Sequence, residues 1–101
     1  MHLVATDSGL VLVDATNFEA FYVDAAGKSL TELAELVEES AAGTIRDEHA
    51  WITRLYVESA LAAHGGKWEE PFDAMVTYAD SKGWVSRDAG AISIRAHVEN
   101  L

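Results

Sequence analysis

The stretch Ala91-Ile-Ser-Ile-Arg-Ala-His-Val-Glu99 decides the fold class, because apolar and polar side chains alternate along it without interruption. In an extended chain, successive side chains point to opposite faces. One face of this strand is therefore apolar and the other polar: Ile92, Ile94, Ala96 and Val98 against Ser93, Arg95, His97 and Glu99. Such a strand is typical of an antiparallel sheet that has one packed face and one solvated face.

Two further strands are predicted near the N-terminus. Residues 2–6 and 10–13 are rich in Leu and Val, and the turn-forming sequence Asp7-Ser-Gly9 separates them. Because residues 10–13 are apolar throughout, we expect them to be covered on both faces as a central strand. Residues 16–24 fit either a helix or a strand, and their Phe, Tyr and Val content favours a strand.

Three helices are predicted between these strands and the last one. The first begins at Ser29, where Ser29-Leu-Thr-Glu32 has the spacing of a capping box, and it ends at Gly43. The second starts at residues 44–47 and runs to His64, because apolar residues recur there at helical spacing. The third covers residues 71–82 and is followed by a short strand at 84–86 and a turn at 87–90.

This order of elements predicts an α+β fold. We expect a mainly antiparallel sheet, made of the N-terminal hairpin strands and the C-terminal strand, with about three helices packed on one face. The chain has 101 residues, half of them apolar, which suits a single domain over residues 1–101. It has no cysteine, which excludes disulfides and thiolate chemistry. Without a signal-peptide pattern or a long apolar run, we expect a cytoplasmic protein that does not enter membranes.

The charge of the chain limits its partners. Seventeen acidic residues against seven basic ones give a formal charge of −10. A field of this sign repels the phosphates of nucleic acids and anionic membranes, so we expect no nucleic-acid partner. The acidic excess is smallest in residues 65–101, and any face that meets an anion is expected there.

No catalytic, nucleotide-binding or metal-binding motif occurs, so we assign no catalytic residue, no cofactor and no metal site. The candidates for a ligand pocket between helices and sheet are His49, Trp51, Tyr56 and His97. His49 and Tyr56 share one face of the predicted second helix, whereas His97 lies on the polar face of the last strand. A purely structural position is the alternative for each of them. The two histidines can meet only if His49 reaches the polar face of the sheet.

The candidates for a protein interface are Val57, Leu61 and Trp68. Val57 and Leu61 lie opposite the Ile52–Tyr56 face of the predicted second helix, which makes that helix apolar nearly all round. A second subunit would cover the extra apolar side, and this predicts a homodimer. Trp68 lies in a predicted loop, and exposed loop tryptophans are common hot spots of interfaces.

The end of the chain resembles part of a winged-helix domain. Residues 71–98 combine a helix, Gly83-Trp-Val, the turn Arg87-Asp-Ala-Gly90 and a strand, in the order of the recognition helix and wing of that family. The resemblance covers less than a third of the chain and implies a transcription-associated module. The predicted helix departs from the family pattern, because Lys82 is its sole base and a DNA-reading helix needs several. A winged shape here would therefore imply protein binding more than DNA binding.

Together these observations favour a non-enzymatic interaction domain that acts through homodimerisation or through a protein partner. A small ligand-binding or catalytic protein with a pocket near His49 is the first alternative. A winged-helix-like module is the second.

Overall fold

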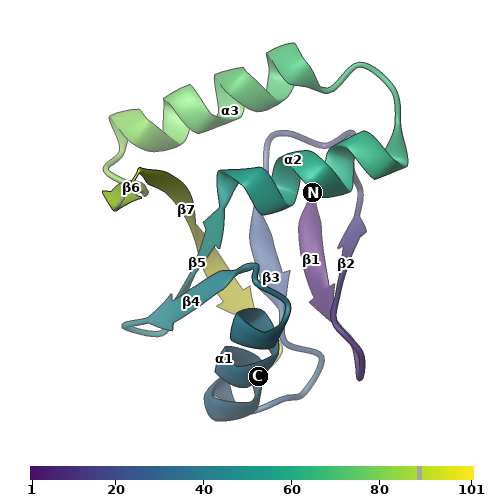
Figure 1. Cartoon of the computed structure of the whole chain (residues 1–101), viewed down its shortest axis with the longest axis vertical. Coiled ribbons are helices and arrows are strands. Elements are labelled where there is room, and N and C mark those ends of the chain that lie inside the picture. The colour runs from purple at the N-terminus through teal and green to yellow at the C-terminus, as the bar shows by residue number, and fades with distance from the viewer. Residues whose placement is uncertain (89) are drawn as a thin grey trace.

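The computed structural model of the chain describes residues 1–88 and 90–101. Within these residues, three helices and a seven-stranded sheet make up the fold (Figure 1). The strands are β1 (His2–Ala5), β2 (Leu10–Val13), β3 (Tyr22–Asp24), β4 (Gly43–Arg46), β5 (His49–Thr53), β6 (Val85–Asp88) and β7 (Ala91–Glu99). The helices are α1 (Leu30–Glu39), α2 (Arg54–His64) and α3 (Glu69–Ser81).

The sheet is mixed but mostly antiparallel, with the strand order β2-β1-β3-β7-β5-β4. The β1–β3 and β3–β7 pairs are parallel, whereas the other described pairs are antiparallel. The long strand β7 organises the sheet. It pairs with β5 along one edge, and with β6 and then β3 along the opposite edge. The predicted α+β class with a mainly antiparallel sheet is confirmed.

The helices pack against the sheet and close the core. Helix α1 contacts β4, α2 contacts β5 and β7, and α3 contacts β6 and β7, lying across one end of the strands (Figure 1). The core joins buried sheet residues to buried helix residues, among them Leu3, Val23, Ile52, Ile94 and Ala96 from the sheet and Leu33, Val37, Val57, Leu61 and Phe72 from the helices. No helix in the described residues is long and apolar enough to cross a membrane.

The predicted helix from residues 44–47 to His64 is wrong in its first half. Residues 43–53 form the hairpin of β4 and β5, and α2 begins at Arg54. Ile45 pairs with Ala50 and Arg46 with His49, which leaves Asp47 and Glu48 as a two-residue loop. Both loop residues have positive φ, at 50° and 66°, as a type I′ hairpin turn requires.

Three smaller predictions also need correction. Strand β2 is an edge strand of the sheet, with Val11 and Val13 exposed, and so it is not central. In the ambiguous segment, strand geometry is limited to β3, and residues 16–20 form turns. The predicted turn at 87–90 is displaced, because Arg87 and Asp88 belong to β6, and residue 89 lies outside the described residues.

The start of the first helix is confirmed in detail. The Ser29 hydroxyl accepts a hydrogen bond from the Glu32 amide at 3.1 Å, and the Glu32 carboxylate accepts one from the Ser29 amide at 3.1 Å. This capping box satisfies two backbone donors that the helix itself leaves free. The helix ends earlier than predicted, at Glu39, so that β4 begins at Gly43.

Candidate functional site

The face of the sheet opposite α1 and α2 is open. Alternate residues of the strands point to this face, and none of them is fully buried, whereas the residues between them form the core. The open face carries three of the four histidines, Tyr22, Trp51 and two arginines: His2, His49, His97, Arg46 and Arg95. Aromatic and basic groups therefore share this surface with the carboxylates of Asp24 and Glu99.

One row of this face crosses five strands. His2 pairs with Tyr22, Tyr22 with His97, and His49 with Arg46. Continuing the β5–β7 register by one residue places His49 opposite His97. The rings of His2 and Tyr22 are stacked, with centroids 4.5 Å apart and planes 6° from parallel. Desolvation raises the pKa of Tyr22, and the neighbouring carboxylates raise it further.

The next row combines guanidinium and indole groups. The Arg46 guanidinium lies over the Trp51 ring, 4.6 Å from its centroid. Trp51 is paired with Arg95 across β5 and β7. The Arg95 guanidinium in turn lies over the Trp84 ring at 5.4 Å, and the Arg95 amide donates a hydrogen bond to the Trp84 carbonyl at 2.8 Å. We call Arg46, Trp51, Arg95 and Trp84 the Arg–Trp ladder.

The structure brings together three of the four predicted ligand residues. His49, Trp51 and His97 lie on the open face, because His49 belongs to β5 and not to a helix. Tyr56 is separated from them, since it lies on α2 on the covered side of the sheet. Burial raises the pKa of its phenol. His49 and Tyr56 therefore lie on different sides of the sheet and do not line a common pocket, whereas the strand register places His49 opposite His97.

The predicted interface residues lie elsewhere. Val57 and Leu61 are 0% and 1% exposed inside the single chain, so neither is available to a second subunit and the argument for a dimer through this helix no longer holds. They are buried because α2 packs on β5 and β7. Trp68 is partly buried at the start of α3, where its ring meets Phe72 edge-on with centroids 6.1 Å apart.

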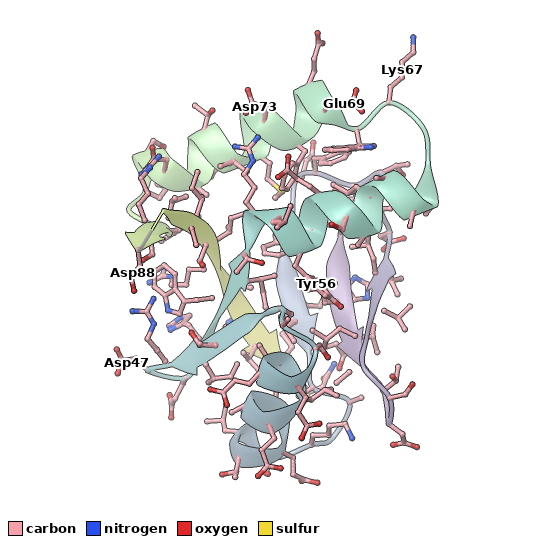
Figure 2. All side chains as sticks on the ribbon, viewed as in Figure 1. Asp47, Tyr56, Lys67, Glu69, Asp73 and Asp88 are labelled. Atoms are coloured by element: carbon pink, nitrogen blue, oxygen red, sulfur yellow. The ribbon has the colours of Figure 1, made fainter. Side chains whose placement is uncertain are left out.

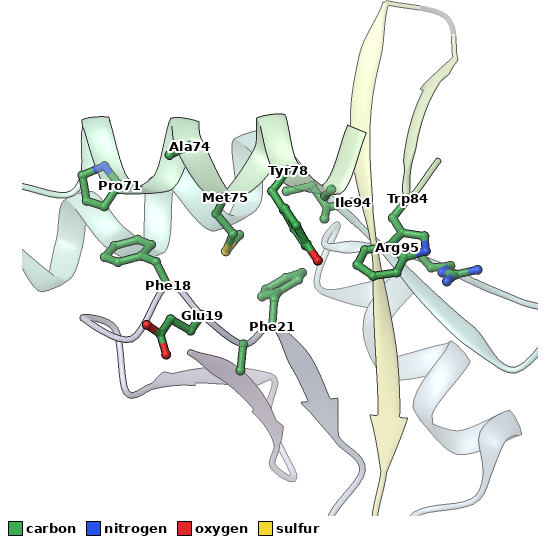
Figure 3. A pocket seen from close by; sticks show the side chains of 12 residues that line it. Phe18, Glu19, Phe21, Pro71, Ala74, Met75, Tyr78, Trp84, Ile94 and Arg95 are labelled. Atoms are coloured by element: carbon green, nitrogen blue, oxygen red, sulfur yellow. The ribbon is translucent and has the colours of Figure 1, made fainter. Parts of the chain in front are cut away.

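A separate groove of about 540 Å³ lies between α3, the segment before β3 and the middle of β7 (Figure 3). It arises from the shape of the sheet. Strand β6 pairs with β7 up to Ile94, and β3 pairs with the same edge of β7 from His97 onward. One aromatic residue lies on each side of the gap between these two pairings. Phe21 precedes β3, and Trp84 precedes β6.

The walls of the groove are mainly apolar. Phe18 and Phe21 form one wall, and Pro71, Met75 and Tyr78 of α3 form the other (Figure 3). The Met1 ammonium donates hydrogen bonds to the carbonyls of Asn17 and Ala20, which anchors the first wall. Burial lowers the pKa of this ammonium, while the charge of Asp14 raises it.

The two ends of the groove differ in charge. Glu19 lies at the Pro71 end, and Arg95 lies at the Trp84 end (Figure 3). Glu69 and Glu70 begin α3 beside Pro71 and are exposed, and Figure 2 shows Glu69 at the start of that helix. In the described part of the chain, no basic side chain lies within 4.0 Å of these three carboxylates.

Sequence reasoning did not identify this groove. The aromatic content of residues 16–24 favoured a strand, but it did not predict the wall of a groove. Tyr78 carried no sequence signal of its own, because its 58% exposure is apparent only in the structure.

No group of three or more His, Asp or Glu side chains in the described residues is arranged to hold a metal ion. The open face and the groove are built mainly from aromatic, apolar and basic side chains. Comparisons of the chain with known protein families, with curated proteins and with solved structures found no match.

Proposed function

We propose that the chain is a non-enzymatic interaction domain. Its groove binds an apolar segment of a protein partner, and basic residues flank that segment in the partner's sequence. The observation that supports this most directly is the groove of about 540 Å³ between α3 and the Phe18–Phe21 wall. It is large enough for several side chains, and a soluble domain rarely leaves so many aromatic groups beside open space without a use for them.

Binding suits this groove better than catalysis. A general acid or base, or an activated nucleophile, needs a partner within hydrogen-bond reach. Glu19 and Arg95 stand at opposite ends of the groove, and no hydrogen bond or ion pair among the described residues joins them.

The charges around the groove favour a basic partner segment. Glu19, Glu69 and Glu70 surround the Pro71 end without a basic side chain within 4.0 Å. A Lys or Arg beside the apolar part of the partner would meet these carboxylates, and the charge of −10 would speed the encounter. The same acids disfavour a second copy of this chain as the occupant, because both copies would bring them to the contact.

Selection from a random peptide library displayed on phage tests this function, followed by fluorescence anisotropy on the enriched peptides. We expect aromatic or aliphatic residues next to Lys or Arg to be enriched. Ala74→Arg places a cation in the groove and should weaken binding at least about tenfold, which corresponds to about 1.4 kcal/mol.

Thr77→Arg is the matched control, because Thr77 is also exposed on α3 but does not line the groove. Peptides that bind both variants equally well would contradict the proposal, as would a selection without enrichment. Light scattering on the free protein tests whether a second copy of the chain occupies the groove. A dimer that Ala74→Arg dissociates would identify that second copy as the occupant and would contradict a foreign segment.

A further inference from the structure

Arg46 and Arg95 differ from most other basic residues of the chain in their partners. Lys28, Arg54 and Arg87 each form an ion pair with a carboxylate. Arg46 and Arg95 have no carboxylate within 4.0 Å in the described part of the chain, although the sequence contains 17 acidic residues. Each of them lies instead over the face of a tryptophan. Neither guanidinium group therefore forms an ion pair with a described side chain.

The tryptophans hold these guanidinium groups in place. A guanidinium over an indole is attracted to the negative ring face, and its N–H groups remain free at the edges of the stack. In the Arg–Trp ladder, Arg46 and Arg95 flank Trp51 across β4, β5 and β7. Less side-chain entropy is lost when a restrained fork of this kind binds an anion.

A hollow of about 430 Å³ lies beside the Arg46 end of the ladder, between the two hairpins β4–β5 and β6–β7. Arg46 and Trp51 line it together with the hydroxyls of Thr44, Ser86 and Ser93. Within the described residues, these three hydroxyls make no hydrogen bond to another protein group. They are free to bind the polar edge of a ligand.

We propose that this hollow binds a small planar anion, namely a flat ring that carries one phosphate or carboxylate, as in a mononucleotide or an aromatic acid. The ring stacks against the flat groups of the Arg–Trp ladder. The anionic group accepts hydrogen bonds from the Arg46 guanidinium, and the hydroxyl groups bind the polar edge of the ring. This site is independent of the proposed groove function, because Arg46 and Trp51 do not line the groove.

The acids near the hollow limit the ligand to a low charge. Asp88 lines the hollow, and Asp47 stands in the β4–β5 loop at the same end of the molecule (Figure 2). Glu99 lies farther along β7, where its Oε1 atom is 3.7 Å from Nε2 of His97. Arg46 is the sole basic residue among the described residues that line the hollow, which suits one anionic group and disfavours the repeated phosphates of a nucleic acid strand.

Two-dimensional NMR titration of the intact protein tests the inference, because the three tryptophan indole N–H groups report on separate places. The probes are adenosine 5′-monophosphate and 2-naphthoate, with adenosine and inorganic phosphate as the ring and the anion alone. We expect one or both planar anions to shift the Trp51 signal with a dissociation constant below about 1 mM, while Trp68 does not move. The better of the two identifies the source of the anion.

Arg46→Met should weaken this binding at least tenfold, whereas Lys67→Met should change it less than twofold. Both side chains are exposed and both variants remove one positive charge, but Figure 2 shows Lys67 projecting into solvent beyond the end of α2, away from the ladder. Three results would overturn the inference: no Trp51 shift at 5 mM of either planar anion, equal affinity for adenosine or phosphate alone, or equal losses in the two variants.

Discussion

Helix α2 carries two leucines in opposite environments, and they test whether its far side is core or interface. Leu61 is 1% exposed, whereas Leu55 is 73% exposed. Leu61→Ala and Leu55→Ala remove the same atoms from the same helix. The difference between the two variants therefore isolates burial.

The expected loss follows from what Leu61 contacts. The substitution removes three buried carbons, worth about 0.8 kcal/mol each, and the cavity that remains raises the total to about 3–5 kcal/mol. Leu55→Ala should change the free energy of unfolding by less than about 0.5 kcal/mol. A domain of this size is stable by roughly 5–10 kcal/mol, so Leu61→Ala should remove a large share of it.

Urea unfolding followed by far-ultraviolet circular dichroism measures both variants. With a slope of about 1.5 kcal/mol per molar urea, a loss of 3 kcal/mol lowers the midpoint by about 2 M. The measurement is made at two protein concentrations about tenfold apart. If Leu61 belongs to the core, the shift is the same at both.

Two results would refute this reasoning. Equal losses for Leu55→Ala and Leu61→Ala would show that burial does not distinguish the two positions. A loss for Leu61→Ala that grows on dilution, together with a wild-type mass of a dimer by light scattering, would return Leu61 to an interface.

Three further outcomes are expected. Glu48→Gly should raise stability by about 1 kcal/mol and the melting temperature by about 4–8 °C, because Glu48 has a φ of 66° that glycine adopts without strain; an unchanged or lower value in differential scanning calorimetry would contradict the type I′ turn. Hydrogen bonds from Ser29 lower the pKa of Glu32 in the folded state, so Glu32→Gln should be less stable than the wild type at pH 7. The urea midpoints of the two proteins should converge as the pH falls from 4.5 through that lowered pKa. A difference between the midpoints that persists at lower pH would contradict this prediction. Duplex DNA should not bind at physiological salt, because α3 contains no Lys or Arg; micromolar anisotropy changes with a steep salt dependence would count against this.

The parts of the fold that sequence predicted well are those governed by local interactions. The capping box needs only Ser29 and Glu32 at the right spacing, and β7 needs only an alternating pattern. The β4–β5 hairpin was missed because its apolar residues also fit helical spacing as far as Tyr56. The decisive feature is the loop of Asp47 and Glu48, which contains no glycine; Asp takes positive φ more often than most residues, but Glu rarely does.

The candidate sites were less predictable, because each depends on residues that meet only in three dimensions. The position of β2 at an edge follows from the parallel pairing of β1 with β3, which no local pattern of Leu10–Val13 encodes. The groove depends on β6 and β3 sharing one edge of β7. The sequence pattern assigned His49 to a helix. The register that places His49 opposite His97 exists only between the strands β5 and β7, so the pattern could not predict it.

The positions of the charged residues also limit the possible ligands more than the net charge of the chain does. Helices α1 and α3 contain acidic residues and no Lys or Arg, whereas the open face of the sheet carries Arg46 and Arg95. Because charges are screened beyond about 8 Å at physiological salt, a ligand at one surface experiences mainly the groups of that surface. A protein with a charge of −10 can therefore present an anion site on one face and an acidic groove end on another.

The two proposed surfaces meet at Arg95 and Trp84, which end both the groove and the Arg–Trp ladder. Replacing Arg95 would remove the basic end of the groove and one fork of the ladder together, and would not tell the two proposals apart. Ala74 lines the groove without touching the ladder, and Arg46 belongs to the ladder without lining the groove. Substitutions at these two positions let either proposal fail while the other stands.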